Sequence, residues 1–185
     1  TPLPCGECDN CRAIADGRAM DVREIDAASN RGIEDARDLR ETVKYPPSEA
    51  RYKVYILDEA HQLTEAAVNA LLKTLEEPPD YVVFLLLTTE PHKILDTLKS
   101  RSQRFELPTL GVADVIGMLE HIAESEGVEA DESALAAIAR AANGGMRDAE
   151  SIFDQIVAYA DEKITLDTVN QVLGITDRET LMRIT

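Results

Sequence analysis

Two short apolar segments, each followed by a pair of polar residues, constrain the fold of this chain more than any other feature. Residues 54–57 form a continuous apolar run that ends in Asp58 and Glu59, and residues 81–89 form a second run that ends in two threonines. Such runs are typical of strands buried on both faces of a parallel sheet. Parallel neighbours end at the same sheet edge, so we expect the two polar pairs to lie side by side.

The polar residues at this edge are of the types that handle phosphate. Carboxylates such as Asp58 and Glu59 can hold Mg²⁺, directly or through water, and can polarise a water for attack on a phosphate. A hydroxyl of Thr88 or Thr89 can orient that water or sense a γ-phosphate. A solvated turn and an ordinary strand end would use the same residues, so the pairs alone leave the site open.

Composition narrows the classes of protein to consider. The 185 residues carry a net charge of −16, of which −6 falls on residues 1–110 and −10 on residues 111–185. This charge argues against nonspecific DNA binding over the whole surface, although a local nucleic-acid face is still allowed. No apolar run approaches ~18–20 residues, and no signal peptide opens the chain, so we expect neither a membrane span nor secretion.

All three cysteines lie together near the start of the chain. Cys5, Cys8 and Cys11 have C-x₂-C-x₂-C spacing, which suits zinc with sulfur ligands. A structural zinc site takes four ligands, and we expect the fourth to be a cysteine upstream of Thr1. A redox C-x-x-C pair and a disulfide are the alternatives. The first lacks a surrounding βαβ pattern, and the second would leave one odd thiol.

The other elements follow from caps, apolar spacing and breakers. Ser29 is expected to cap a helix that runs to about Lys44, and Thr64 to cap a helix that Pro78 stops. Short strands are expected at residues 22–27 and 105–107, and short helices at 9–15 and 91–98. After a linker at 108–112 the pattern is entirely helical, with helices at about 113–126, 131–142, 146–160 and 165–173.

Three arginines are candidates for binding an anion. Arg101 and Arg104 lie in an exposed loop, where a guanidinium can act as an arginine finger on a phosphate held by a neighbouring subunit, or can be an ordinary surface residue. Arg147 lies in the first turn of a helix, where the helix dipole disfavours a cation. This position indicates an anion supplied from elsewhere.

The order of these motifs closely resembles the gamma/tau family of AAA+ clamp-loader subunits of bacterial DNA polymerase III. The motifs run from the cysteines and D-A-A-S through D-E-A-H, N-A-L-L-K-T-L-E-E-P-P, T-T and S-R to G-G-M-R-D-A, over about residues 4–174. The resemblance implies an α/β fold: an AAA+ parallel sheet with flanking helices, truncated at its N-terminus and carrying an inserted zinc module, followed by an all-α lid domain. The implied domains are a zinc module at 1–18, a partial AAA+ core at 19–109, the lid at 110–174 and the start of an oligomerisation domain at 175–185.

The resemblance also implies roles for single residues. Asp58 and Glu59 match the Walker B carboxylates, for Mg²⁺ and for water activation, and one of the threonines matches sensor 1. Arg101 matches the arginine finger acting in trans, although the family's S-R-C reads S-R-S here, and Arg147 matches sensor 2. The remaining matches are three of four zinc ligands, Cys5, Cys8 and Cys11, and three residues near the DNA backbone, Asn30, Arg31 and Thr97.

The implied function is an ATPase subunit of the DNA polymerase III holoenzyme that uses Mg-ATP to load a sliding clamp on primed DNA, with a structural zinc ion. The implied partners are other clamp-loader subunits, the clamp and DNA, with the polymerase core and helicase reached through missing C-terminal regions. The implied location is the bacterial cytoplasm, at the nucleoid. No G-x-x-x-x-G-K-[ST] loop is present. We therefore expect an internal fragment that is inactive alone.

Two other functions stay open at this stage. One is a non-catalytic clamp-loader paralogue that contributes an arginine finger in trans, although such paralogues tend to lose the acidic pair. The more remote one is a different AAA+ protein, a helicase or a chaperone, against which the N-A-L-L-K-T-L-E-E-P-P stretch and the cysteines speak.

Overall fold

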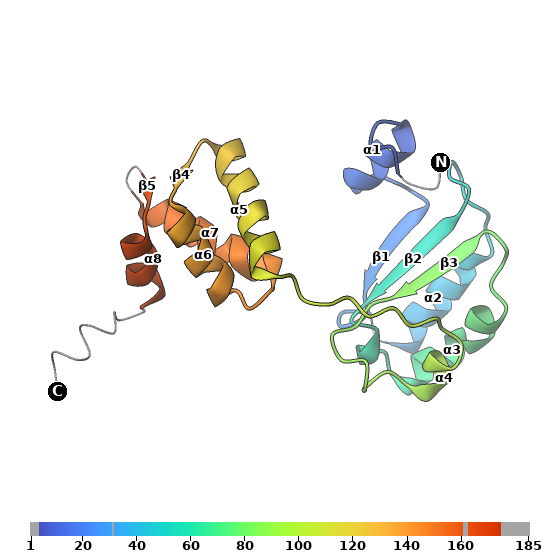
Figure 1. Cartoon of the computed structure of the whole chain (residues 1–185). Helices are drawn as coiled ribbons and strands as arrows, with labels where there is room; N and C mark the ends of the chain where they lie inside the picture. Colours follow the sequence, from blue (N-terminus) through green and yellow to red (C-terminus); the bar gives the residue numbers. More distant parts are fainter. Residues whose placement is uncertain (1–3, 31, 161–162, 175–185) are drawn as a thin grey trace. The chain divides into compact units, whose positions relative to one another are not determined.

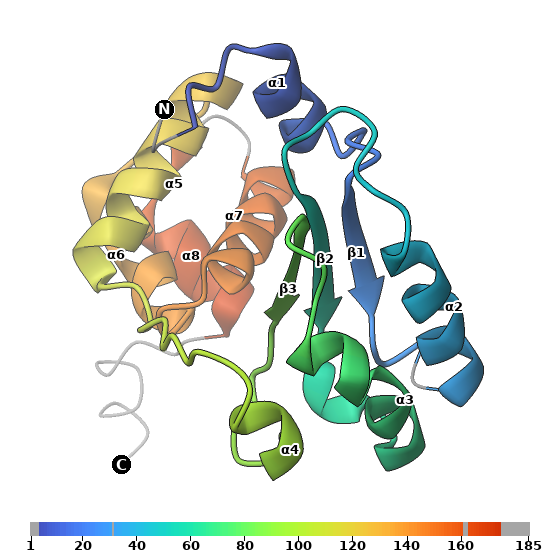
Figure 2. The same cartoon turned by 90° about the vertical axis from the view of Figure 1, so that its right-hand side faces the viewer.

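The computed structural model describes residues 4–30, 32–160 and 163–174, and the chain divides into two compact units, residues 1–105 and 106–185. The first unit contains a three-stranded parallel sheet in the order β1 (Val22–Asp26), β2 (Lys53–Asp58) and β3 (Val82–Leu86). Figure 2 shows the three arrowheads at one end of the sheet. The two apolar runs are therefore parallel neighbours, as predicted.

One face of this sheet carries the core of the first unit. It packs against α2 (Ile33–Val43) and α3 (Glu65–Glu76), which lie on the same side of the strands (Figure 1). Tyr55 of β2 is fully buried there, and its ring stacks on Phe84 of β3 with centroids 5.4 Å apart. Every second residue of β2 is buried, which fixes the strand register, because a slip by one residue would turn the core side chains to the other face.

The expectation that both faces of these strands are buried is wrong, because the opposite face of the sheet carries apolar side chains that are open to solvent. Val83, Leu85 and Leu87 are 37%, 45% and 44% exposed. No strand pairs with the outer edge of β3 in the part of the chain that the structure describes.

Two buried charged residues fix the start of β2. The Asp21 carboxylate, 4% exposed, accepts three backbone N–H groups of residues 48–50 at 2.7 to 2.8 Å, and the Lys53 ammonium donates to the Thr42 carbonyl at 2.9 Å. Burial raises the pKa of Asp21, but the three N–H groups and the nearby Lys53 outweigh it, so the pKa lies below its usual value. The two residues therefore replace the water that this turn would otherwise need.

Three shorter elements complete the first unit. They are α1 (Asp9–Ala15), the 3₁₀ turn η1 (Ala60–Gln62) directly after β2, and α4 (Asp96–Lys99). Thr64 caps α3 as predicted, and its hydroxyl accepts the Ala67 N–H at 3.2 Å.

The second unit is a small helical module. It contains α5 (Val112–Glu126), α6 (Glu132–Ala141), α7 (Met146–Tyr159) and α8 (Leu166–Leu173), which enclose Leu119, Ile138 and Phe153. The linker residue Leu110 donates its N–H to the Gly144 carbonyl at 3.3 Å, and Gly144 has a φ of +84°. A Cβ at this glycine would lie 2.9 Å from the Leu110 carbonyl oxygen, so the close approach requires glycine.

The fold class is as predicted, whereas four other local expectations are wrong. Ser29 does not cap α2, because its hydroxyl donates to Asp26 at 2.6 Å, and the N-cap is Gly32. Residues 105–107 form no strand, since no described strand pairs with them. The helix expected at 91–98 is reduced to α4. The helical unit contains one parallel pairing, between β4 (Glu129–Ala130) and β5 (Lys163–Ile164).

Arg31 and residues 175–185, for which a DNA contact and a further domain are predicted, lie outside the described residues. In the described chain, no helix has the length and apolarity that crossing a membrane requires.

Candidate functional site

The polar pair after β2 is held in an unusual backbone conformation. Asp58 ends the strand, and Glu59 has a left-handed backbone with φ 48° and ψ 42°. A residue with a side chain adopts this conformation at a cost of about 1 kcal/mol, and such strain is common at functional sites. The Asp58 carboxylate accepts the Glu59 N–H at 2.9 Å, and its second oxygen has no hydrogen-bond partner within the described residues. The turn therefore separates the two carboxylates, which follow each other in sequence.

The structure distinguishes the two threonines that the sequence left equivalent. Both lie beyond the end of β3, in the loop that follows it. The exposed Thr89 hydroxyl donates to the Glu59 carboxylate at 3.3 Å. The half-buried Thr88 hydroxyl lies 3.0 Å from His61 Nδ1 and accepts the Glu90 N–H at 3.0 Å. Thr89 thus faces Glu59, while Thr88 is used within the fold.

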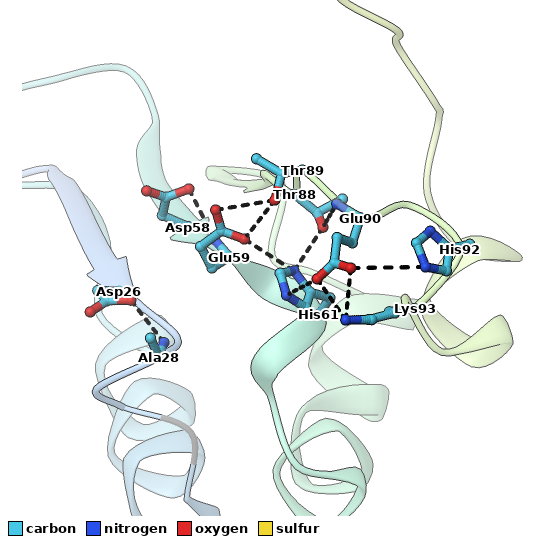
Figure 3. A network of polar contacts seen from close by, with 10 residues as sticks. All are labelled: Asp26, Ala28, Asp58, Glu59, His61, Thr88, Thr89, Glu90, His92 and Lys93. Carbon is cyan, nitrogen blue, oxygen red and sulfur yellow. Dashed lines mark hydrogen bonds and ion pairs between the residues drawn. The ribbon is translucent and has the colours of Figure 1, made fainter. Parts of the chain in front are cut away.

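A polar network around His61, for which the sequence predicted no role, joins the two strand ends (Figure 3). His61 Nδ1 lies 3.1 Å from the Glu59 carboxylate, and Nε2 lies 3.1 Å from the Glu90 carboxylate. The hydrogen bond from Lys93 is the main cause that lowers the pKa of Glu90. The signal was present in the last letter of D-E-A-H and in the glutamate after T-T, but the sequence does not show that they meet.

A third carboxylate lies at the same sheet edge. Asp26, the last residue of β1, is the register partner of Asp58. Its oxygens accept the Ala28 N–H at 2.8 Å (Figure 3) and the Ser29 hydroxyl at 2.6 Å. These hydrogen bonds, that of Ser29 first, lower the pKa of Asp26. The edge is therefore strongly acidic, which suits a hard cation such as Mg²⁺.

Two of the three candidate arginines, Arg101 and Arg147, have different surroundings. Arg101 forms an ion pair with Glu76 of α3, with Nε 2.7 Å from the carboxylate, and also donates to the Thr97 carbonyl at 2.8 Å. Arg147 is exposed in the first turn of α7 of the second unit, and in the described chain its guanidinium has no hydrogen-bond partner. Arg101 is therefore held in place, whereas Arg147 is available to an anion.

The three cysteines form a cluster whose geometry fits a metal ion. The sulfur atoms of Cys5 and Cys11 are 3.8 Å apart, and the three sulfur atoms lie within 4.8 Å of one another. Tetrahedral ligands at the zinc–sulfur distance of about 2.3 Å would lie about 3.8 Å apart, so the spacing suits zinc. Hydrogen bonds to the Cys5 sulfur, that from the Cys8 N–H first, lower the pKa of Cys5 to about 7, and this favours the thiolate that zinc binds.

Two of the three residues suggested for DNA contact, Asn30 and Thr97, lie among the residues that the structure describes. Asn30 donates its side-chain amide to the Asp26 carbonyl at 3.0 Å. Thr97 lies in α4, whose four residues are too few for the helix N-terminus to bind phosphate strongly.

The fold is shared with solved structures. Thermotoga maritima RuvB, described as a Holliday junction branch migration motor, matches with a TM-score of 0.67 at 21% identity over 88% of this chain and 55% of that chain. A DNA polymerase III gamma subunit-related protein from Thermotoga maritima matches with a TM-score of 0.51 at 24% identity over 90% of this chain and 61% of that one. The chain has the fold of the AAA+ class.

Sequence comparison gives the family. A family model described as DNA polymerase III, delta subunit, matches residues 1–111, and the ATPase lid domain of the DNA polymerase III clamp loader subunit matches residues 114–162. The chain belongs to the family of bacterial DNA polymerase III clamp-loader subunits.

Its curated relatives are tau and gamma subunits. The tau subunit of Escherichia coli is 48% identical over 177 residues, which are 96% of this chain and 28% of the relative, and that of Bacillus subtilis is 46% identical over 171 residues, which are 92% and 30%. These relatives do not favour the non-catalytic paralogue. The chain spans less than a third of their length.

Proposed function

We propose that this chain supplies the hydrolytic half of an ATP site that drives a bacterial clamp loader. The observation that carries the proposal is the juxtaposition of Asp58, Glu59 and Thr89 at the carboxyl end of two parallel strands, with the Thr89 hydroxyl 3.3 Å from Glu59. In open α/β sheets, ligands bind at this edge. The tau and gamma relatives support the same assignment.

Each residue of the site has a distinct role in the proposed reaction. Glu59 accepts a hydrogen bond from the attacking water and increases its nucleophilicity, and Thr89 acts as sensor 1, because its hydroxyl lies beside that carboxylate. Asp58 holds Mg²⁺, which would neutralise charge on the phosphates. Arg147 binds the nucleotide from the lid.

Arg101 acts in trans on the nucleotide of a neighbouring subunit in this proposal. Its ion pair with Glu76 joins side chains that are 34% and 43% exposed. Pairs this exposed contribute at most about 1 kcal/mol, so the arginine can be released at small cost when a phosphate competes for it.

The cofactors and partners are part of the proposal. Cys5, Cys8 and Cys11 hold a structural zinc ion together with one further ligand. Asn30, Arg31 and Thr97 approach the backbone of primed DNA, and the other partners are clamp-loader subunits and the sliding clamp, in the bacterial cytoplasm. The 185 residues contain no phosphate-binding G-x-x-x-x-G-K-[ST] loop, so this chain alone hydrolyses ATP negligibly.

A chimera tests the function. This chain replaces the aligned segment of the Escherichia coli tau subunit, and ATP turnover is measured in the reconstituted loader with primed DNA. We expect turnover by the chimera, a loss of about 100-fold or more in Glu59→Gln, as for loss of a general base, and no change in Glu77→Gln, a matched exposed control. Turnover that survives Glu59→Gln, or clear turnover by the 185-residue chain alone, would contradict the proposal.

A further inference from the structure

His61 is more buried than the two glutamates beside it, yet the proposed reaction gives it no role. Its side chain is 10% exposed, while the two glutamates beside it, Glu59 and Glu90, are 30% and 36% exposed. It lies in η1, directly after the turn that carries Glu59. A buried polar side chain needs partners for its polar atoms, and those of His61 are the residues of the site.

Both ring nitrogens of His61 face a carboxylate. Nδ1 is 3.1 Å from Glu59 and 3.0 Å from the Thr88 hydroxyl, and Nε2 is 3.1 Å from Glu90. Behind Glu90, Lys93 holds the same carboxylate at 2.8 Å, and the exposed His92 lies 3.9 Å away. The imidazole is thus fixed at both ends, and the element it comes from is short and packed.

We propose that His61 is a positioning residue, which fixes the Glu59 carboxylate by joining it to Glu90 on the loop after β3. The inference rests on the proposed function, because it concerns the orientation of the group that activates water. A glutamate side chain has three rotatable bonds, and the Thr89 hydrogen bond of 3.3 Å is long. A second contact, from a ring that cannot turn, removes most of the remaining freedom.

The arrangement also makes the loop after β3 part of the site. The Glu90 carboxylate contacts His61 Nε2 and does not contact the Glu59 carboxylate. In this proposal, the effect of the Glu90 side chain on turnover therefore passes through His61. If Glu90 acts only through His61, the effects of removing the two side chains are not additive. If the two residues made independent contacts, the effects would add, so a double-mutant cycle distinguishes the two cases.

The test uses the tau chimera with His61→Ala, Glu90→Ala and both together. We expect His61→Ala to lower kcat about 10- to 100-fold with KM for ATP unchanged, as for a misplaced catalytic group. Glu90→Ala should lower kcat less, and should add nothing when His61 is already absent. His121→Ala, at an exposed histidine of α5 in the second unit, is the control and should leave kcat unchanged.

Chemical rescue gives a readout that a merely structural role would not move. Added imidazole should restore part of kcat to His61→Ala and nothing to Glu59→Gln. If His61→Ala does not fold, His61→Gln, which keeps one donor, replaces it in the same cycle. Full activity of the folded His61 variant, additive effects with Glu90→Ala, or absence of rescue would overturn the proposal. Failure of the proposed function would appear separately, as turnover that survives Glu59→Gln.

Discussion

The buried carboxylate of Asp21 offers a quantitative test of what holds the sheet together. In Asp21→Asn, only one oxygen is left to accept the three N–H groups of residues 48–50. The NH₂ group of the amide takes the place of the other oxygen, and since it is a donor it cannot accept the N–H group that faces it. Hydrogen bonds to a charged group contribute about 1.5–3 kcal/mol and neutral ones about 0.5–1.5. One lost bond and two weakened ones therefore cost about 3 kcal/mol of unfolding free energy.

This loss is large against the total stability of a domain, which is about 5–15 kcal/mol. For a unit of this size it corresponds to a fall of roughly 10–20 °C in melting temperature. The chain has no tryptophan, but four of its five tyrosines lie in the first unit, so tyrosine fluorescence during urea unfolding reports that unit. Asp38→Asn, on the exposed face of α2, is the matched control and should change stability by less than about 0.5 kcal/mol.

The pH dependence of this difference has a definite sign. Because the pKa of Asp21 is lowered by folding, its stabilisation is present above the unfolded value of about 3.9 and is lost as pH falls through the folded pKa. The difference in unfolding free energy between wild type and Asp21→Asn should be largest near pH 7. It should decrease at pH values below about 4. A gap below 1 kcal/mol at neutral pH, or one that does not change down to pH 3, would refute this account of the anchor.

Three further predictions concern other parts of the chain. Cobalt(II) added to the reduced chain should give thiolate-to-metal charge-transfer absorption. Cys8→Ser should weaken this absorption, because the cluster then offers two thiolates. A Cys8→Ser spectrum identical to that of the wild type would contradict a metal site shared by the three cysteines. Glu76→Gln should free Arg101 and raise ATP turnover in an assembled tau chimera, whereas Arg101→Ala should abolish most of that turnover. Equal turnover in wild type and Glu76→Gln would show that the ion pair does not restrain the arginine. Gly144→Ala should destabilise the second unit by about 1–3 kcal/mol, because a Cβ would lie 2.9 Å from the Leu110 carbonyl oxygen and the φ of +84° disfavours a side chain. Circular dichroism during thermal unfolding measures the loss of stability. An unchanged melting temperature would argue against the close approach.

The sequence was most informative where a pattern has one physical solution. A short apolar run such as residues 54–57, bounded by polar residues, favours a strand in a parallel sheet. Parallel neighbours end at one edge, which predicts that the polar residues after the two runs lie close together, as Thr89 and Glu59 do. The cysteine spacing likewise allows the three sulfur atoms to lie close together, and in the structure they lie within 4.8 Å of one another. These features depend on local periodicity and spacing, which a single sequence contains.

The sequence was least informative where two local preferences compete or where a partner is required. Ser29 is a good helix cap in isolation, but the Asp26 carboxylate, three residues earlier, takes its hydroxyl first. Residues 105–107 have strand-forming side chains, yet a strand exists only beside another strand. The contact of His61 with Glu90 depends on how two turns 29 residues apart face each other, and neither periodicity nor spacing describes that arrangement.

The open apolar face of the sheet has a consequence for the chain in solution. Val83 and Leu85 lie on β3 and Leu87 follows it directly, and no strand of the described chain pairs with the outer edge of β3. Exposed apolar edge strands are surfaces through which copies of a protein can associate into aggregates. The net charge of −16 opposes this through mutual repulsion, and salt screens that repulsion over about 10 Å at 0.1 M. The colloidal stability of the isolated chain should therefore fall as ionic strength rises, so the acidic surface acts as its protection against self-association.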